Sequence, residues 1–271
     1  MNISVIVEDN PISRAYIYYF YLNGLKFNKI YLLNGPKFPL FNNKLKTLMN
    51  FKKNNFHAIN FLKNHNIHDL LGQIEDHFNL DYNFILKMFE YENLQKVGGN
   101  LVYINSFDVN NSNLIKYILK EDKDCFILNT GKQILNKILS TNYKFLHIHP
   151  GYLPYVKGAD SSIHMIDKFN QLGVSSFVIN RKIDEGEVIL RNKLKLPKFK
   201  LNDLKRYSIK DQYRIWFSFI DPAIRVSQLS PLLQLLDREK IEFIKYSKEE
   251  SKYYSFAEDE LLSRVFGRVF I

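Results

Sequence analysis

The sequence predicts an α/β protein built on a mostly parallel sheet with helices on both faces. Short apolar runs of strand length alternate with segments of helical periodicity, and this alternation is typical of βαβ units. Turn signals such as Asn23-Gly24 separate the segments. The composition, with 46% hydrophobic and 24% charged residues, is ordinary for a globular protein. A Rossmann-like arrangement is the expectation that follows.

The expected elements run in order along the chain. The first strand is the apolar run from Ile3 to Val7, and Pro11 and Ser13 open the first helix. Strands are expected at residues 3–7, 29–33, 101–104, 125–128, 145–149, 174–179 and 188–196. Helices are expected at residues 11–22, 57–65, 80–95, 113–119, 131–139 and 161–169. Residues 36–56 are polar and show no clear periodicity.

A change in composition at Pro197 suggests two parts. We expect residues 1–197 to form an α/β catalytic domain, with 124–195 as its best-defined stretch, and residues 198–271 to form a C-terminal helix-plus-hairpin extension. In that extension, residues 200–236 are expected to be helical, with Trp216 buried. Residues 240–244 and 253–256 are expected to pair as a hairpin, and a short terminal helix is expected from Glu258.

The net charge of +10 comes from lysines scattered between Lys26 and Lys252, not from a dense basic run. No motif of a nucleic-acid-binding module is visible, so a nucleic-acid partner is not favoured. A lysine-rich surface is the simplest interpretation. The charge also suits a phosphorylated substrate, a nucleotide-linked substrate or the polyglutamate tail of a folate.

Cys125 is the single cysteine, so neither an intramolecular disulfide nor a cysteine-based zinc site is available. Its apolar neighbours indicate a core position. The first residues are typical of a strand and not of a signal peptide. No apolar run is long enough to span a bilayer. We therefore expect a soluble, cytoplasmic protein without a membrane partner.

Two histidines, His147 and His149, fall at the end of an expected strand. Residues two apart on a strand point to the same face, and parallel sheets bind ligands at the carboxyl ends of their strands. A glycine-containing loop up to Asp160 follows them. A purely structural pair is the less favoured interpretation. A general-base role and a metal site, completed by Asp184 or Asp160, are equally open on these residues alone.

The stretch 124–195 resembles the folate-dependent formyltransferase family, which includes glycinamide ribonucleotide transformylase, methionyl-tRNA formyltransferase and the sugar N-formyltransferases. The family's signature runs Asn-x-His-Pro, two residues, Leu-Pro, three residues and Gly, with an Asp-x-Gly some thirty-five residues beyond the histidine. Here His149-Pro150 is followed by Leu153-Pro154 and Gly158, and Asp184-Glu185-Gly186 begins 35 residues after His149. The resemblance covers roughly a quarter to a third of the chain.

The resemblance implies that His149 is catalytic, that Asp184 is its partner acid and that 10-formyltetrahydrofolate is the formyl donor. An attacking amine must lose a proton, and the resulting oxyanion needs a hydrogen-bond donor; a protonated imidazole beside a carboxylate fits that need. Gly158 and Asp160 are expected beside the substrate. The residues expected at the pterin of the cofactor are Asn129, Gly131, Glu185 and Gly186.

One residue departs from the signature, because His147 stands where the family has an asparagine that polarises the formyl oxygen. An imidazole N–H can donate the same hydrogen bond, so we expect His147 to take part in catalysis. The alternatives are a different acyl donor, a non-catalytic protein of this fold, or a metal-dependent hydrolase using His147, His149 and Asp184. By chain length the sugar branch fits best, so the expected acceptor is a small-molecule amine, an amino sugar linked to a nucleotide. The oligomeric state is open, with a homodimer as one expectation.

Other polar residues have weaker patterns. Asp160 and His164 either orient the amine or serve as a helix N-cap and a surface histidine. The remaining histidines (His57, His65, His68 and His77) are expected to be solvated. The segment from Asp221 to Arg225 is expected to pack the C-terminal part, although Arg225 could reach a phosphate or carboxylate.

Overall fold

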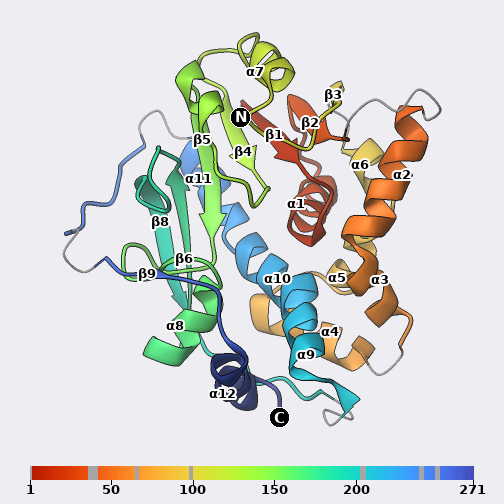
Figure 1. Ribbon diagram of the computed structural model, residues 1–271, viewed down its shortest axis with the longest axis vertical. Coiled ribbons are helices and arrows are strands. Elements are labelled where there is room, and N and C mark those ends of the chain that lie inside the picture. Colours follow the sequence, from red (N-terminus) through yellow and green to blue (C-terminus); the bar gives the residue numbers. More distant parts are fainter. Residues whose placement is uncertain are drawn as a thin grey trace.

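The computed structural model describes residues 2–35, 42–64, 67–97, 100–201, 206–237, 241–247 and 251–271. Within these ranges the chain forms one seven-stranded sheet in the order β3-β2-β1-β4-β5-β7-β8 (Figure 1). The strands are β1 (Ile3–Val7), β2 (Lys29–Leu33), β3 (Asn100–Ile104), β4 (Phe126–Asn129), β5 (Lys144–His149), β7 (Leu172–Val178) and β8 (Glu187–Leu194). Neighbouring strands pair in parallel from β3 through β2, β1 and β4 to β5, and β7 is antiparallel to both its neighbours. The predicted fold class, α/β with a mostly parallel sheet, is confirmed.

Helices cover both faces of this sheet. The helices are α1 (Pro11–Leu22), α2 (Asn43–Asn54), α3 (Phe56–Leu62), α4 (His68–Phe78), α5 (Phe84–Met88), α6 (Asn93–Lys96), α7 (Ser112–Ile118), α8 (Ser161–Phe169), α9 (Ile209–Ile215), α10 (Asp221–Val226), α11 (Leu229–Leu236) and α12 (Asp259–Val269). A short 3-10 helix, η2 (Lys137–Thr141), and a π-helical turn, η4 (Trp216–Ile220), complete the set. None of the described helices is long and apolar enough to cross a membrane.

The alternation of side chains along β1 divides the core into two layers. Val5 and Val7 belong to the larger apolar cluster, which includes α1, α4, α10 and α12. Ile6 points to the opposite face and joins a smaller cluster under α7 and η2. Because Trp216 and Phe266 are buried in the larger cluster, the C-terminal helices share a core with the sheet. The division at 197/198 into a domain and an extension stays a prediction.

Local capping explains where α1 begins. Asn10 accepts a hydrogen bond from the amide of Ser13, and the Ser13 hydroxyl accepts one from the amide of Asn10. This reciprocal cap, with Pro11 in the first turn, starts the helix where the sequence predicts it. Helix α1 then packs against α10 (Figure 1), which carries two charged residues of the site described below.

The helix expected at 131–139 is not formed. Side-chain hydrogen bonds to distant segments hold this stretch irregular: Gln133 donates to the Phe107 carbonyl at 2.6 Å, and Asn110 accepts from the Asn136 amide at 2.7 Å. Such bonds compete with helical ones. Only the 3-10 turn η2 remains at its end.

Two other expectations need correction in the polar region before β3. The single helix expected at 80–95 is two short helices, α5 and α6, separated at Phe89–Glu92. Helix α4 was not predicted, although its Leu70, Leu71, Ile74 and Phe78 are buried. Residues 43–54, which have no clear pattern, form α2.

The prediction of a C-terminal hairpin is also wrong. Lys240 lies outside the described residues, and within 241–247 the chain contacts β8 through one bond, from the Ile244 amide to the Val188 carbonyl at 2.8 Å. Tyr253–Tyr254 forms β9, which instead pairs in parallel with β6 (Lys157–Gly158). Gly158, with φ of 93°, permits this pairing, since a Cβ there would lie 2.2 Å from the Tyr254 carbonyl oxygen.

Candidate active site

A cleft of about 640 Å³ opens at the carboxyl ends of β4 and β5. Its walls come from the loop after β4, the β6–α8 segment, the β7–β8 loop, the α9–α10 region and the C-terminal strand β9. Ligands of parallel α/β sheets bind at such ends. Seven residues singled out from the sequence line it together: Asn129, Gly131, His147, His149, Gly158, Asp160 and Asp184.

His149 is held between two acceptors. Its Nε2 lies 3.0 Å from the Val156 carbonyl oxygen, and its Nδ1 lies 3.6 Å from Asp184 Oδ2. A carbonyl oxygen can only accept, so Nε2 carries a proton. A second proton on Nδ1 would face the carboxylate. The ring is almost fully buried, and Gly151 packs against it so closely that a Cβ would lie 2.6 Å from Nε2.

Asp184 is ionised in this setting. It sits in a left-handed turn with φ of 52°, a conformation that aspartate tolerates, and its Oδ2 accepts a hydrogen bond from the Gly158 amide at 2.8 Å. Burial opposes the charge, but the neighbouring His149, the Gly158 amide, His147 and Arg225 outweigh it and lower the pKa of Asp184. The carboxylate therefore joins the Gly158 loop to His149.

His147 is neutral at physiological pH. Burial, followed by the nearby Arg225 guanidinium, lowers its pKa to about 4. Its Nδ1 lies 3.2 Å from the Asn129 carbonyl oxygen, and its Nε2 lies 3.4 Å from Arg225 Nη1. The carbonyl requires a proton on Nδ1, and the guanidinium can only donate, so Nε2 is left as an acceptor. Both ring nitrogens are therefore engaged, and the only imidazole N–H points to a protein carbonyl.

Arg225 lines the cleft, whereas the sequence favoured a packing role for its segment and left a contact with a phosphate or carboxylate open. Its Nε donates to Asp221 Oδ2 at 2.8 Å, its Nη1 donates to the Ile148 carbonyl, and it is hydrogen-bonded to Tyr16. Asp221 is fully buried and, despite the burial of the guanidinium, raises the pKa of Arg225. The only local signal was an Asp and an Arg four residues apart in an apolar helical stretch.

Glu185 and Gly186 lie outside the residues that line the cleft. Glu185 pairs with Lys157 at 2.6 Å and with Lys182 at 3.6 Å. Gly186 makes the turn into β8 possible, because a Cβ there would lie 1.8 Å from the Val178 carbonyl oxygen. Both residues support the Asp184 turn from behind, outside the lining of the cleft. Their direct contact with a cofactor stays a prediction.

Asp160 and His164 link the cleft to the C-terminal strand. Asp160 stands at the N-cap position of α8 but makes no capping bond; it accepts from the Tyr213 hydroxyl at 3.0 Å and from the Ala257 amide at 2.9 Å. His164 is buried, not on the surface, and its Nε2 lies 2.9 Å from the Ser255 carbonyl. These contacts fix the position of the C-terminal strand at the cleft.

The rim of the cleft is cationic and aromatic. Tyr253 and Phe256 are 57% and 76% exposed, which is unusual for aromatic side chains and leaves their faces open to a planar ligand. The cations on the rim are Lys132, Arg181, Lys182 and Arg214. His57, expected to be solvated, is exposed and lines the same rim. Sequence patterns could not reveal this grouping, since the residues come from five separate segments.

A metal site finds little support in the side-chain arrangement. In the part of the chain that the structure describes, no three His, Cys, Asp or Glu side chains are grouped to hold a metal ion. Around His147, a guanidinium lies 3.4 Å from the nitrogen that would bind the metal. Two like charges that close repel each other strongly at low dielectric.

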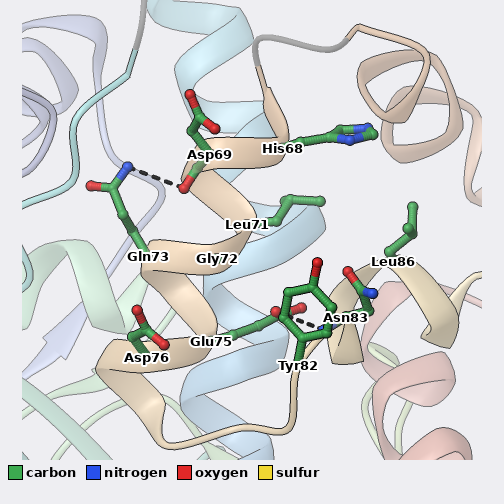
Figure 2. Close-up of a pocket in the computed structure, with 10 residues that line it drawn as sticks. All are labelled: His68, Asp69, Leu71, Gly72, Gln73, Glu75, Asp76, Tyr82, Asn83 and Leu86. Carbon is green, nitrogen blue, oxygen red and sulfur yellow. Dashed lines mark hydrogen bonds between the residues drawn. The ribbon is translucent and has the colours of Figure 1, made fainter.

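A second groove, of about 510 Å³, lies on the outer side of α4 (Figure 2). The buried charged side chain there is Glu75, and its carboxylate accepts from the amides of Asn83 and Ile85 at 2.9 and 2.8 Å. Glu75 thus ties α4 to the start of α5. Its role is structural, and the groove holds no part of the His149–Asp184 constellation.

No protein-family model and no curated protein sequence matches the chain. Among solved structures, a sugar N-formyltransferase from a Shewanella species is 15% identical, with a TM-score of 0.49 over 94% of this chain and 76% of that chain. A 4-N formyltransferase from Francisella tularensis is 13% identical, with a TM-score of 0.46 over 94% and 76%. An N-formyltransferase from Helicobacter canadensis, in complex with folinic acid and dTDP-3-aminofucose, is 13% identical, with a TM-score of 0.46 over 94% and 71%. Likenesses of this strength assign neither a family nor an activity.

Proposed function

We propose that the protein is an enzyme that transfers a formyl group from 10-formyltetrahydrofolate to the primary amine of a nucleotide-linked amino sugar. One observation carries the proposal. His149 and Asp184, 35 residues apart in the sequence, lie 3.6 Å apart at the carboxyl end of β5, and Gly158 of the same motif donates to that carboxylate. These are the residues that resemble the formyltransferase signature, and they meet inside one cleft.

The arrangement suits the chemistry of formyl transfer. The amine attacks the formyl carbon, the carbonyl oxygen becomes an oxyanion, and N10 of the folate departs with a proton. An ionised Asp184 accepts the amine's proton through a water molecule. His149, whose Nδ1 lies 3.6 Å from Asp184 Oδ2, keeps that carboxylate oriented.

In this proposal, different walls of the cleft bind the folate and the amino sugar. The pterin lies between the Asn129–Gly131 segment and the turn at Asp184, and the amino sugar lies beside Gly158 and Asp160. The exposed Tyr253 and Phe256 suit stacking on a nucleobase. The cationic rim suits a diphosphate or the glutamate tail of the folate. A cytoplasmic location and a homodimer remain predictions that belong with this function.

Calorimetric titration with a hydrolysis-stable deaza analogue of the formyl donor tests the first half of the proposal. We expect saturable one-to-one binding. The affinity for the analogue should be lower in Asn129→Ala, a change at the proposed pterin wall and away from Phe256. A metal assay on the same sample covers the hydrolase alternative. If the analogue does not bind and zinc or iron is tightly held, the metal-dependent hydrolase using His147, His149 and Asp184 takes the place of this proposal.

The second half is tested by turnover. A panel of dTDP- and UDP-linked amino sugars, beginning with dTDP-3-aminofucose, is incubated with the donor, and products are separated by mass spectrometry. Transfer should occur with wild type and disappear in His149→Ala. Product formation that His149→Ala leaves unchanged would overturn the assignment of the site.

A further inference from the structure

The oxyanion of formyl transfer needs a hydrogen-bond donor, and His147 does not provide one. The family's asparagine stands at this position, but the Nδ1–H of His147 points to the Asn129 carbonyl at 3.2 Å, and its Nε2 has no proton to give. Nor does His149 replace it, since its Nε2–H points to the Val156 carbonyl at 3.0 Å. Another group at the same place must therefore donate the hydrogen bond to the oxyanion.

Arg225 is the donor at that place. Its Nη1 lies 3.4 Å from His147 Nε2. An N–H donor therefore stands beside the ring nitrogen of His147 that carries no proton. A contact of 3.4 Å is at the long end of the hydrogen-bond range. An oxyanion is a much stronger acceptor than an imidazole nitrogen, and a charged donor forms the stronger bond to it. The guanidinium lines the cleft, so a ligand can reach it.

Its support explains why a charged group can stay there. Asp221, which is fully buried, accepts from Arg225 Nε at 2.8 Å. The pair is thus neutral overall, which limits the cost of burial. The Ile148 carbonyl and Tyr16 fix the guanidinium further. A rigid, preorganised donor of this kind is what oxyanion stabilisation requires.

We infer that Arg225, positioned by Asp221, donates the hydrogen bond to the formyl oxygen, and that His147 is a neutral positioning residue for this guanidinium; the inference rests on the proposed formyl transfer. As the amine nitrogen bonds to the formyl carbon, the C=O π pair moves to oxygen and Arg225 stabilises it. The pair then re-forms the carbonyl as the bond to N10 breaks, and the proton that Asp184 takes from the amine through water passes by the same route to N10. Arg225 keeps all its protons.

Isotope-edited infrared spectroscopy tests this without knowledge of the acceptor. The probe is the deaza analogue of 10-formyltetrahydrofolate with ¹³C in the formyl group, bound to the full-length protein. A hydrogen bond from Arg225 weakens the C=O bond, so the bound band should lie at lower frequency in wild type than in a variant without the guanidinium. The tested variant is Asp221→Leu/Arg225→Met, which replaces the buried pair with apolar side chains of similar volume, a change that buried ion pairs often tolerate.

Controls separate the donor role from a structural one. Asp9→Asn/Arg14→Met removes another buried ion pair, Arg14 with Asp9, which lies outside the residues lining the cleft; it should leave the band unchanged. Arg225→Lys keeps a charge and one donor, so its band should lie between those of wild type and the double variant. With an active acceptor, loss of one oxyanion donor should lower kcat by about 10²–10³ with little change in the KM of the donor.

The outcomes are distinguishable. If the analogue does not bind to wild type, the proposed function fails, and this inference with it. If the analogue binds to wild type and to Asp221→Leu/Arg225→Met with the same band position, formyl transfer survives and Arg225 is not the donor. A shift confined to the Arg225 variants supports the inference. Where the double variant does not fold, Arg225→Lys gives the same decision.

Discussion

Replacing Asp184 by asparagine isolates the charge of the central carboxylate. The backbone at this position has φ of 52°, which asparagine adopts as readily as aspartate. The amide oxygen can still accept the Gly158 N–H. What disappears is the negative charge 3.6 Å from His149 Nδ1. The change therefore alters electrostatics while the shape of the turn is kept.

The size of the effect follows from the geometry. The side chains of His149 and Asp184 are only 4% and 13% exposed, so water screens their interaction little. The lost carboxylate is also the proposed acceptor of the amine's proton, and a positioned general base contributes about 10²–10⁴-fold in rate. The kcat should therefore fall by about 10³-fold. The KM of the formyl donor should change little, because asparagine keeps the shape of the turn against which the pterin is proposed to lie.

The assay measures transfer of a ¹³C-labelled formyl group to the best acceptor of the panel, with circular dichroism to show that the variant is folded. Asp167→Asn is the matched control, since Asp167 pairs with Arg264 on α12 and does not line the cleft; its kcat should equal that of wild type. A folded Asp184→Asn protein that keeps more than about a tenth of the wild-type kcat would refute the reasoning, because a side-chain amide cannot accept the amine's proton.

Two further predictions concern stability. The pKa of His147 is about 4 in the folded protein, against 6.5 for an unperturbed imidazole. The folded state binds fewer protons between these values, so stability should be lost as pH falls from about 6.5 to about 4, by about 3 kcal/mol. His147→Asn should flatten this part of a urea-unfolding pH series. Gly186→Ala would place a Cβ 1.8 Å from the Val178 carbonyl and should cost about 1–3 kcal/mol, a fall of roughly 2–12 °C in Tm. Gly267→Ala, at an exposed position of α12 with nothing within 4 Å, should raise Tm slightly. Equal effects of the two alanines in differential scanning calorimetry would contradict the packing argument.

Some elements could be predicted from the sequence because their signals are local. Strand β1 begins and ends where its apolar run does, since the run is buried on both faces of the sheet. Helix α8 covers Ser161–Phe169, as predicted, because an apolar stripe and Asn170 define it. His149 and Asp184 were singled out by the 35-residue spacing of the motif that they resemble, and in the structure Nδ1 and Oδ2 of the two residues lie 3.6 Å apart.

The remaining elements depend on contacts between distant segments. Residues 131–136 stay irregular because Gln133 and Asn136 bond to residues 24–26 positions earlier in the chain. Strand β9 pairs with a segment almost a hundred residues before it, so its partner was not visible locally. Arg225 reaches His147 across 78 residues. Sequence periodicity carries no information about contacts between distant segments. The contact between Arg225 and His147 was therefore not predicted from the sequence.

The central claim is that this cleft transfers a formyl group from a folate to an amine. The most direct measurement incubates wild type and His149→Ala with ¹³C-formyl-labelled 10-formyltetrahydrofolate and dTDP-3-aminofucose, and follows the label by NMR. We predict that wild type moves the label onto the sugar nitrogen as a formamide and that His149→Ala does not. Label that remains on the folate across the whole panel of amino sugars, in folded protein that binds the donor, would contradict the account.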